Sequence, residues 1–189
     1  MARFTRAELE SFRDAEVPDL VGPSTRLLFV GINPGLWTAA TQAHFARRGN
    51  RFYPALFRAG LVDRLIDASG GYAPQDRALL LESGLGISNL VPRATARADE
   101  LSDDELRAGS ARLESLVTAV RPRVVAVLGV TAYRVAFGRR SAQVGRQPET
   151  LAGAQLWVAP NPSGLNAHSS LDDLAAAYRE IGVAAGLLT

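Results

Sequence analysis

The sequence contains no cysteine and no lysine, because all 21 residues counted as lysine or arginine are arginine. The absence of cysteine excludes disulfides, thiol nucleophiles, iron–sulfur clusters and the usual structural zinc sites. The absence of lysine excludes a lyase step through a side-chain Schiff base, and leaves only the α-amino group for such chemistry. His44 and His168 are the two histidines, so we expect neither a metal site nor a cofactor.

Long hydrophobic runs are also missing. No stretch of about 18 uncharged apolar residues occurs, as a membrane-spanning helix would need. Residues 1–12 carry charges where a secretion signal would be apolar. We therefore expect a cytoplasmic protein that does not bind membranes. The 189 residues, 47% of them hydrophobic, are enough for one domain over residues 1–189 with a single core.

The formal net charge of +2 conceals a segregated pattern. Residues 20–62 and 115–148 together contain eleven arginines and no acidic residue, while the rest of the chain holds ten arginines and all 19 acidic residues. Basic and acidic surfaces are thus expected on different parts of the molecule. This favours a polyanion such as nucleic acid as the partner, the alternative being an arginine-rich composition with no specific partner.

Buried strands and helices alternate along the sequence. Apolar runs predict four strands, at residues 26–32, 85–90, 123–129 and 155–160. Helical patterns cover residues 5–14, 51–60, 74–83, 103–120, 130–137 and 171–186. Capping boxes support the helix starts after Ser102 and Ser170. The alternation predicts an α/β fold, a single three-layer domain with a central, mainly parallel sheet of four to five strands flanked by helices.

Two turns of similar sequence follow predicted strands. GINPG occupies residues 31–35 after the first strand, and NPSGL occupies residues 161–165 after the last. Ligands of open parallel sheets bind beyond the carboxyl ends of the strands. A single Asn-Pro is an ordinary turn starter, but two copies at such places indicate a shared site whose backbone N–H groups face a ligand. The stretch 36–49 is expected to be a long irregular loop, and loops of that length are often functional.

These two turns resemble the paired motifs of the mismatch-specific uracil-DNA and thymine-DNA glycosylase family. Further segments fit its bacterial branch, namely Phe45-Ala46, Asn50-Arg51-Phe52, Asn89-Leu90-Val91, Arg93, Thr95, Val127-Leu128-Gly129 and Ala132-Tyr133. The resemblance covers residues 26–182, so we expect residues 1–24 to form a peripheral segment. Other uracil glycosylases fit less well. One family carries aspartate and histidine where this chain has Asn33 and Asn161, and the iron–sulfur families need cysteine.

The resemblance implies a monofunctional DNA glycosylase of base-excision repair. Such an enzyme flips uracil, notably opposite guanine, out of duplex DNA and hydrolyses its N-glycosidic bond to leave an abasic site. Asn33 would hold the attacking water, and Asp99 is the carboxylate to test first as its helper, unless it is a solvent-exposed acid before the Ser102 cap. Phe45 would stack on the base. The remaining pocket residues implied are Gly31, Ile32 and Asn161, with backbone N–H groups around Ile32, Asn33 and Phe45 stabilising the uracil anion. Trp37 is a further possible pocket or strand contact.

The resemblance also implies how DNA is held. Leu165 would fill the gap left by the flipped nucleotide, with Gly164 allowing close approach and Asn166 bonding to the partner base. The arginine expected nearby is absent, and His168 is the candidate to replace it, or else an ordinary loop histidine. Candidate phosphate contacts are Arg47, Arg48, Arg51, Thr131, Arg139, Arg140, Arg146, His168 and Ser169. We expect a monomer acting on double-stranded DNA that contains uracil mismatches.

Three alternatives remain at this point. The chain could be a broader glycosylase that accepts other damaged bases or single strands. It could be a module that binds mismatches without turnover. It could also be a nucleotide-binding α/β protein, although no G-x-G-x-x-G or GxxxxGK[ST] loop occurs.

Overall fold

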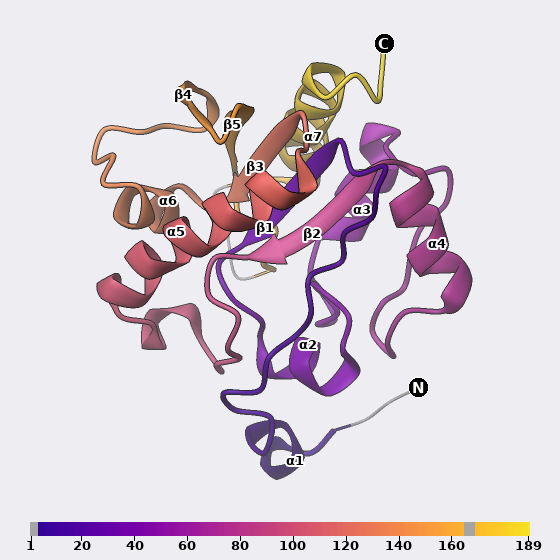
Figure 1. Ribbon diagram of the computed structural model, residues 1–189. Helices are drawn as coiled ribbons and strands as arrows, with labels where there is room; N and C mark the ends of the chain where they lie inside the picture. The colour runs from indigo at the N-terminus through magenta and orange to yellow at the C-terminus, as the bar shows by residue number, and fades with distance from the viewer. Residues whose placement is uncertain (1–3, 165–168) are drawn as a thin grey trace.

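The computed structural model describes residues 4–164 and 169–189, and its centre is a five-stranded sheet (Figure 1). The strands lie in the order β2-β1-β3-β5-β4. All neighbours are parallel except β4 and β5, which are antiparallel. The bounds are β1 Leu27–Gly31, β2 Leu85–Asn89, β3 Val124–Leu128, β4 Gly145–Leu151 and β5 Ala154–Ala159. The predicted α/β class and mainly parallel sheet are confirmed.

Helices cover both faces of the sheet, as expected where parallel strands are buried on both sides. Their bounds are α1 Arg6–Glu10, α2 Leu36–Thr41, α3 Phe52–Ala59, α4 Pro74–Glu82, α5 Asp103–Val120, α6 Val130–Ala136 and α7 Leu171–Ala184, with a short 3₁₀ helix η1 at Ala98–Glu100. Both predicted capping boxes form. The Ser102 hydroxyl accepts from Glu105 N and the Ser170 hydroxyl accepts from Asp173 N, which fixes the starts of α5 and α7.

Alternate residues of β1, β3 and β5 enter two separate cores. Leu27 and Phe29 of β1 point to a core completed by α3, α4 and α7, where Phe29 meets Phe52 edge-on with ring centroids 5.3 Å apart. Leu28 and Val30 point to the opposite core, which α5 and α6 cover. The three layers explain why the central strands are fully buried hydrophobic runs.

Three elements differ from the sequence prediction. Residues 36–41 form α2 inside the stretch expected to be an irregular loop, and Gly35 begins this helix without a side-chain cap. Strand β4 was missed because its sequence, GRQPETL, is polar and includes Pro148. It lies at the sheet edge with an irregular register between Arg146 and Thr150, and an edge is where proline is tolerated in a sheet. The first helix ends at Glu10 rather than at residue 14.

The segment expected to be peripheral, residues 1–24, is attached to the sheet in part. Leu20 and Ile87 exchange two backbone hydrogen bonds of 2.8 Å, so residues near Leu20 run beside β2. The Asp19 carboxylate accepts from Ser88 Oγ at 2.6 Å and from Arg112 at 2.8 Å. This segment therefore packs directly behind the carboxyl end of β2. Among the described residues, no helix has the length and apolar character needed to cross a membrane.

Candidate active site

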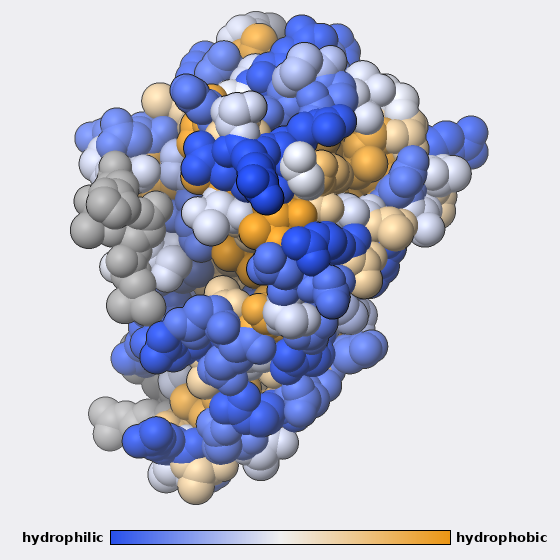
Figure 2. Space-filling model, turned by 90° about the vertical axis from the view of Figure 1, so that its left-hand side faces the viewer, coloured by the Kyte–Doolittle hydropathy of each residue, from blue (hydrophilic) through white to orange (hydrophobic). Residues whose placement is uncertain are grey.

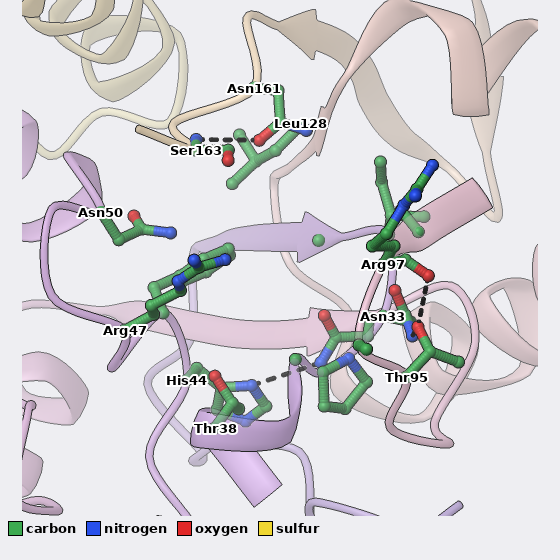
Figure 3. Close-up of a pocket in the computed structure, with 18 residues that line it drawn as sticks. Asn33, Thr38, His44, Arg47, Asn50, Thr95, Arg97, Leu128, Asn161 and Ser163 are labelled. Atoms are coloured by element: carbon green, nitrogen blue, oxygen red, sulfur yellow. Dashed lines mark hydrogen bonds between the residues drawn. The ribbon is translucent and has the colours of Figure 1, made fainter. Parts of the chain in front are cut away.

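A cavity of about 170 Å³ opens at the carboxyl ends of the strands, where the sequence predicted a site. Both Asn-Pro turns line it, since Asn33 after β1 and Asn161 after β5 face the same space. Figure 3 shows Asn33 with Thr95 and Arg97 on one side, and His44, Arg47 and Asn50 on the other. Other lining residues are Gly31, Ile32, Pro34, Gly35, Thr38, Phe45, Asn89, Ala96, Ala98, Leu128 and Ser163. The cavity thus collects Asn33 and four pocket residues expected from sequence, Gly31, Ile32, Phe45 and Asn161.

The Asn33 amide is held in one orientation. Its Nδ2 donates to Thr95 Oγ1 at 2.7 Å and to the Arg93 carbonyl at 3.1 Å, so both amide hydrogens are used. Thr95 is 1% exposed, and its own hydroxyl donates to the Arg97 carbonyl at 2.7 Å. No described residue donates to Asn33 Oδ1. Asn33 therefore offers the cavity a hydrogen-bond acceptor rather than a donor.

Gly31 lets the Asn89 side chain and the Phe45 ring approach the backbone closely. A Cβ at this position would lie 2.5 Å from Asn89 Oδ1 and 3.2 Å from the Phe45 ring, so any side chain would displace one of them. Phe45 has the left-handed backbone angle φ of 55°, and its ring stacks on Phe52 with centroids 4.2 Å apart. An aromatic ring and an amide oxygen that line the same cavity suit a planar ring with polar edges.

His44 lies behind Asn89 and is 2% exposed. Its Nε2 is 3.0 Å from the Pro18 carbonyl, which only accepts, so Nε2 carries the hydrogen. Burial lowers the pKa of His44, which keeps the ring neutral and leaves Nδ1 as an acceptor. Asn89 Nδ2 lies 3.3 Å from this Nδ1 and donates to it. The Asn89 oxygen is therefore the atom turned toward Gly31.

The His44 backbone is fixed by two tyrosines. The Tyr53 hydroxyl donates to the His44 carbonyl at 2.7 Å, and the His44 N–H donates to the Tyr72 hydroxyl at 3.2 Å. The two hydroxyls are 2.8 Å apart, and Tyr72 donates because the Tyr53 hydrogen is already used. Burial raises the pKa of Tyr72 to about 12, so both hydroxyls keep their protons near neutral pH. This pair holds the strained turn that precedes Phe45.

Backbone donors are available around the cavity. The N–H groups of Ile32, Asn33 and Phe45 donate to no acceptor within the described part of the chain. All three residues line the cavity. Unpaired backbone N–H groups at such a site suit an anion or a carbonyl oxygen of a ligand.

Two residues singled out from sequence lie outside the lining. Asp99 is in η1, its side chain is 60% exposed, and it forms an ion pair with Arg97. This placement favours the alternative of a solvent-exposed acid near the Ser102 cap. Trp37 does not line the cavity either, because its indole N–H donates to the Ser69 carbonyl at 2.9 Å and its ring packs on Phe4.

The second turn is bound to the segment that precedes α3. Asn161 Oδ1 accepts from Ser163 N at 2.9 Å, and a Cβ on Gly164 would lie 2.6 Å from the Gly49 carbonyl. The close approach that requires glycine here is therefore to the chain itself. Arg51 donates to the carbonyls of Ser163, at 2.9 Å, and of Ser169. Its guanidinium therefore holds the turn, and the expected phosphate contact of Arg51 stays a prediction. The predicted roles of Leu165, Asn166 and His168 lie outside the described residues.

The other candidate phosphate contacts surround the cavity unevenly. Thr131 and Ser169 line a second hollow, beside Ile32 and Asn161. Arg47 lines the main cavity. The side chains of Arg47, Arg48, Arg140 and Arg146 are exposed. Arg139 forms an ion pair with Glu149 at 2.5 Å. Figure 2, which views the side of α6 and β4, shows a mostly hydrophilic face with small hydrophobic patches. No group of three or more potential metal ligands occurs among the residues that the structure describes.

Sequence reasoning gave no catalytic or binding role to His44, Asn89 or Thr95. Asn89 and Thr95 entered only as parts of the resemblance, and His44 only as a possible metal ligand. Asn89 carried a usable signal, because it is a polar residue at the carboxyl end of a buried strand. The role of His44 depends on Pro18, and no pattern links the two residues in the sequence.

The fold and the cavity define an α/β protein with a polar cavity at the carboxyl ends of its parallel strands. The sequence model of the Uracil DNA glycosylase superfamily matches residues 18–182, and the chain belongs to this superfamily. Its members are DNA glycosylases, a class of hydrolases, which supports a DNA glycosylase role here. The chain is also similar to a solution NMR structure from Methanosarcina acetivorans, described as a candidate uracil DNA glycosylase. The TM-score is 0.61 at 17% identity over 88% of this chain and 96% of that chain, which shows a shared fold.

Proposed function

We propose that the protein is a monofunctional uracil-DNA glycosylase that acts on uracil in duplex DNA, notably opposite guanine. One observation carries the proposal. Two Asn-Pro turns far apart in sequence line one cavity, together with the Phe45 ring and the Asn89 amide. The cavity lies beyond a sheet edge, so a base must leave the helical stack to enter it. We propose that the enzyme acts as a cytoplasmic monomer without a metal or cofactor.

The base would be recognised by shape and by its polar edge. The Phe45 ring would stack on the pyrimidine, supported from behind by Phe52. Asn89 Oδ1 would accept from uracil N3–H, and its second Nδ2 hydrogen would donate to O4. The backbone N–H groups of Ile32 and Phe45 would donate to the remaining carbonyl oxygen of uracil.

The reaction breaks the bond between uracil N1 and sugar C1′, and the bonding electrons leave with uracil. Backbone donors at the cavity stabilise the departing anion, which then takes up a proton. Water adds to C1′ and releases its proton to solvent. Asn33 Oδ1 would accept a hydrogen bond from this water and orient it. An amide does not remove a proton as a carboxylate does, so the chemical step should be slow.

The deciding experiment is single-turnover release of uracil from a duplex with uracil opposite guanine. The intact protein should release the base, and Asn33→Ala should lower the rate by about 100-fold, within the range for a group that positions a reactant. Gln75→Ala is the matched control, because Gln75 is an exposed amide on α4 outside the cavity lining.

Each alternative has its own outcome. Tight binding of the mismatch with no release by either protein would identify a binding module and overturn the enzymatic proposal. Equal release of several damaged bases, or of uracil from single strands, would identify the broader glycosylase. Asp99→Asn separates its two readings, since loss of activity in this variant would assign it a part in catalysis.

A further inference from the structure

His44 is held on every polar atom. The Pro18 carbonyl accepts from Nε2, Asn89 donates to Nδ1, and the hydroxyls of Tyr53 and Tyr72 bind the backbone carbonyl and N–H. His44 belongs to the cavity lining, but it is only 2% exposed, and its Nδ1 faces Asn89. Because the ring is fixed in this way, the orientation of the Asn89 amide is set by its hydrogen bond to His44.

The chemistry of this neighbour decides which way the Asn89 amide faces. In the neutral ring, Nε2 carries the hydrogen and donates it in a hydrogen bond to the Pro18 carbonyl. Nδ1 can then only accept, so Asn89 must donate to it. Asn89 then presents Oδ1 and one N–H to the cavity. A protonated ring would carry hydrogens on both nitrogens, and Asn89 would have to turn its oxygen to His44 and its amino group to the cavity.

The two amide orientations fit different pyrimidines. Uracil offers a donor at N3 and an acceptor at O4, which match an amide that presents Oδ1 and N–H in that order. Cytosine offers an acceptor at N3 and a donor at N4, so it would face acceptor against acceptor and donor against donor. Mismatched polar groups in a buried site are costly, so the orientation discriminates between the bases.

We infer that His44 is a specificity-determining residue, which fixes the amide of Asn89 in the orientation that accepts uracil and rejects cytosine. The inference rests on the proposed function and adds the residue that sets base preference. His44 acts through Asn89 and does not touch the base, so it is a positioning residue.

The same geometry makes the preference depend on pH. The groups facing His44 are Asp19 from the N-terminal segment, which favours the charged ring, Arg77 from α4, which opposes it, and the neutral hydroxyls of Tyr53 and Tyr72. Burial is the largest influence and lowers the pKa of His44 below its ordinary value of 6.5. Uracil preference should therefore be full near neutral pH and weaken on the acid side of 6.5.

The test measures binding rather than turnover. Two duplexes carry either uridine or cytidine with a 2′-fluoro sugar, which slows cleavage, each opposite an abasic site so that pairing strength does not differ. The ratio of the two dissociation constants gives base preference. It is measured from about pH 5.5 to about pH 8 for the intact protein and for His44→Ala, His44→Gln and Tyr72→Phe, with thermal unfolding as the check of folding.

The variants separate the effect of the His44 ring on base preference from its contribution to folding. His44→Ala should lower the preference for uracil about tenfold, the effect of one lost orienting hydrogen bond. Glutamine offers an N–H for Pro18 and an oxygen for Asn89 but does not titrate, so His44→Gln should keep the preference and lose its change with pH. Tyr72→Phe removes a hydrogen bond to the same residue's backbone but keeps the titrating ring, so the preference should still change with pH.

An unchanged ratio in folded His44→Ala, or the same pH dependence in His44→Gln as in the intact protein, would overturn the inference. If His44→Ala does not fold, the pH dependence of His44→Gln decides alone. Failure of the proposed function is distinguishable, because it is absence of uracil release from the cleavable duplex, whatever the binding ratio.

Discussion

Asn33 and Thr95 are joined by a hydrogen bond of 2.7 Å between the Asn33 side-chain amide and the Thr95 hydroxyl, although 62 positions separate them in the chain. The bond connects the turn after β1 to the loop after β2, and Thr95 N donates to the Pro34 carbonyl beside it at 3.1 Å. The backbone bond places the two loops, and the side-chain bond selects the Asn33 rotamer. The acceptor that faces the cavity therefore depends on a hydroxyl from another loop.

Replacing Thr95 by valine should slow uracil release without unfolding the protein. Valine keeps the shape and the backbone bond to Pro34 but removes one of the two acceptors for Asn33 Nδ2, so the amide is held less firmly. One hydrogen bond of about 1 kcal/mol corresponds to a rate loss of about fivefold to tenfold. Single-turnover kinetics measure it. Thr95→Ser restores the hydroxyl and should restore the rate; a serine variant as slow as the valine variant would contradict this account.

Gly31→Ala should abolish base binding in the cavity. The added methyl group would lie 2.5 Å from Asn89 Oδ1 and 3.2 Å from the Phe45 ring, so the two groups proposed to hold uracil would be displaced. We expect uracil release to fall by about 100-fold or more, on the order of 3 kcal/mol of lost transition-state binding. Gly22→Ala is the matched control, because its methyl group would meet Leu81 at an ordinary 3.4 Å. Equal activity of the two variants would mean that the base binds elsewhere.

Acid should destabilise the folded protein through His44. Its folded pKa lies below the unfolded value of 6.5, so below pH 6.5 the unfolded chain binds more protons than the folded one. This contribution to stability is complete above 6.5 and is lost as the pH falls toward the folded pKa. Urea unfolding of the intact protein and His44→Gln over this range measures the difference. The stability difference between the two proteins should change with pH below 6.5 and stay constant above it.

Arg140 should contribute to DNA binding through a phosphate. It is exposed and follows α6, on the side of the molecule that also carries β4. For Arg140→Gln we expect the plot of log binding constant against log salt to lose about 0.9 of its slope, the effect of one neutralised phosphate. Arg123→Gln is the control. Arg123 is exposed just before β3, so it lies at the amino end of this strand and outside the cavity lining. Equal losses in both variants would point to net charge instead of a defined contact.

The sequence predicts this fold well where hydrophobic period and capping agree. The α5 bounds match the prediction because Ser102 caps its start and apolar residues recur at helical spacing. Strand β4 was not predicted, because an edge strand needs no hydrophobic run and its pairing with β5 depends on backbone groups. The short helix α2 was not predicted, because it has no side-chain cap and is too short to show the helical period of hydrophobic residues.

The parts of the site that lie in the two Asn-Pro turns could be predicted from the sequence. The parts that depend on contacts between distant loops could not. Asn33 and Asn161 could be placed together because both follow strands of one parallel sheet. Thr95 and His44 act through hydrogen bonds to residues distant in the chain, and such partners leave no local pattern. Asp99 lies in the loop after a strand, but its side chain forms an ion pair with Arg97 outside the cavity lining, so its part in catalysis stays a prediction.

Pro18 lies in a stretch that belongs to neither sheet nor helix, and it supplies only a main-chain oxygen to the surroundings of His44. Its side chain is exposed and takes no part in that contact, so the path of the backbone supplies the oxygen whatever the residue type. A shortened protein beginning at Arg26 would lose this oxygen together with the buried Leu20 and its two hydrogen bonds to Ile87. We expect such a truncation to lower stability as well as discrimination between pyrimidines.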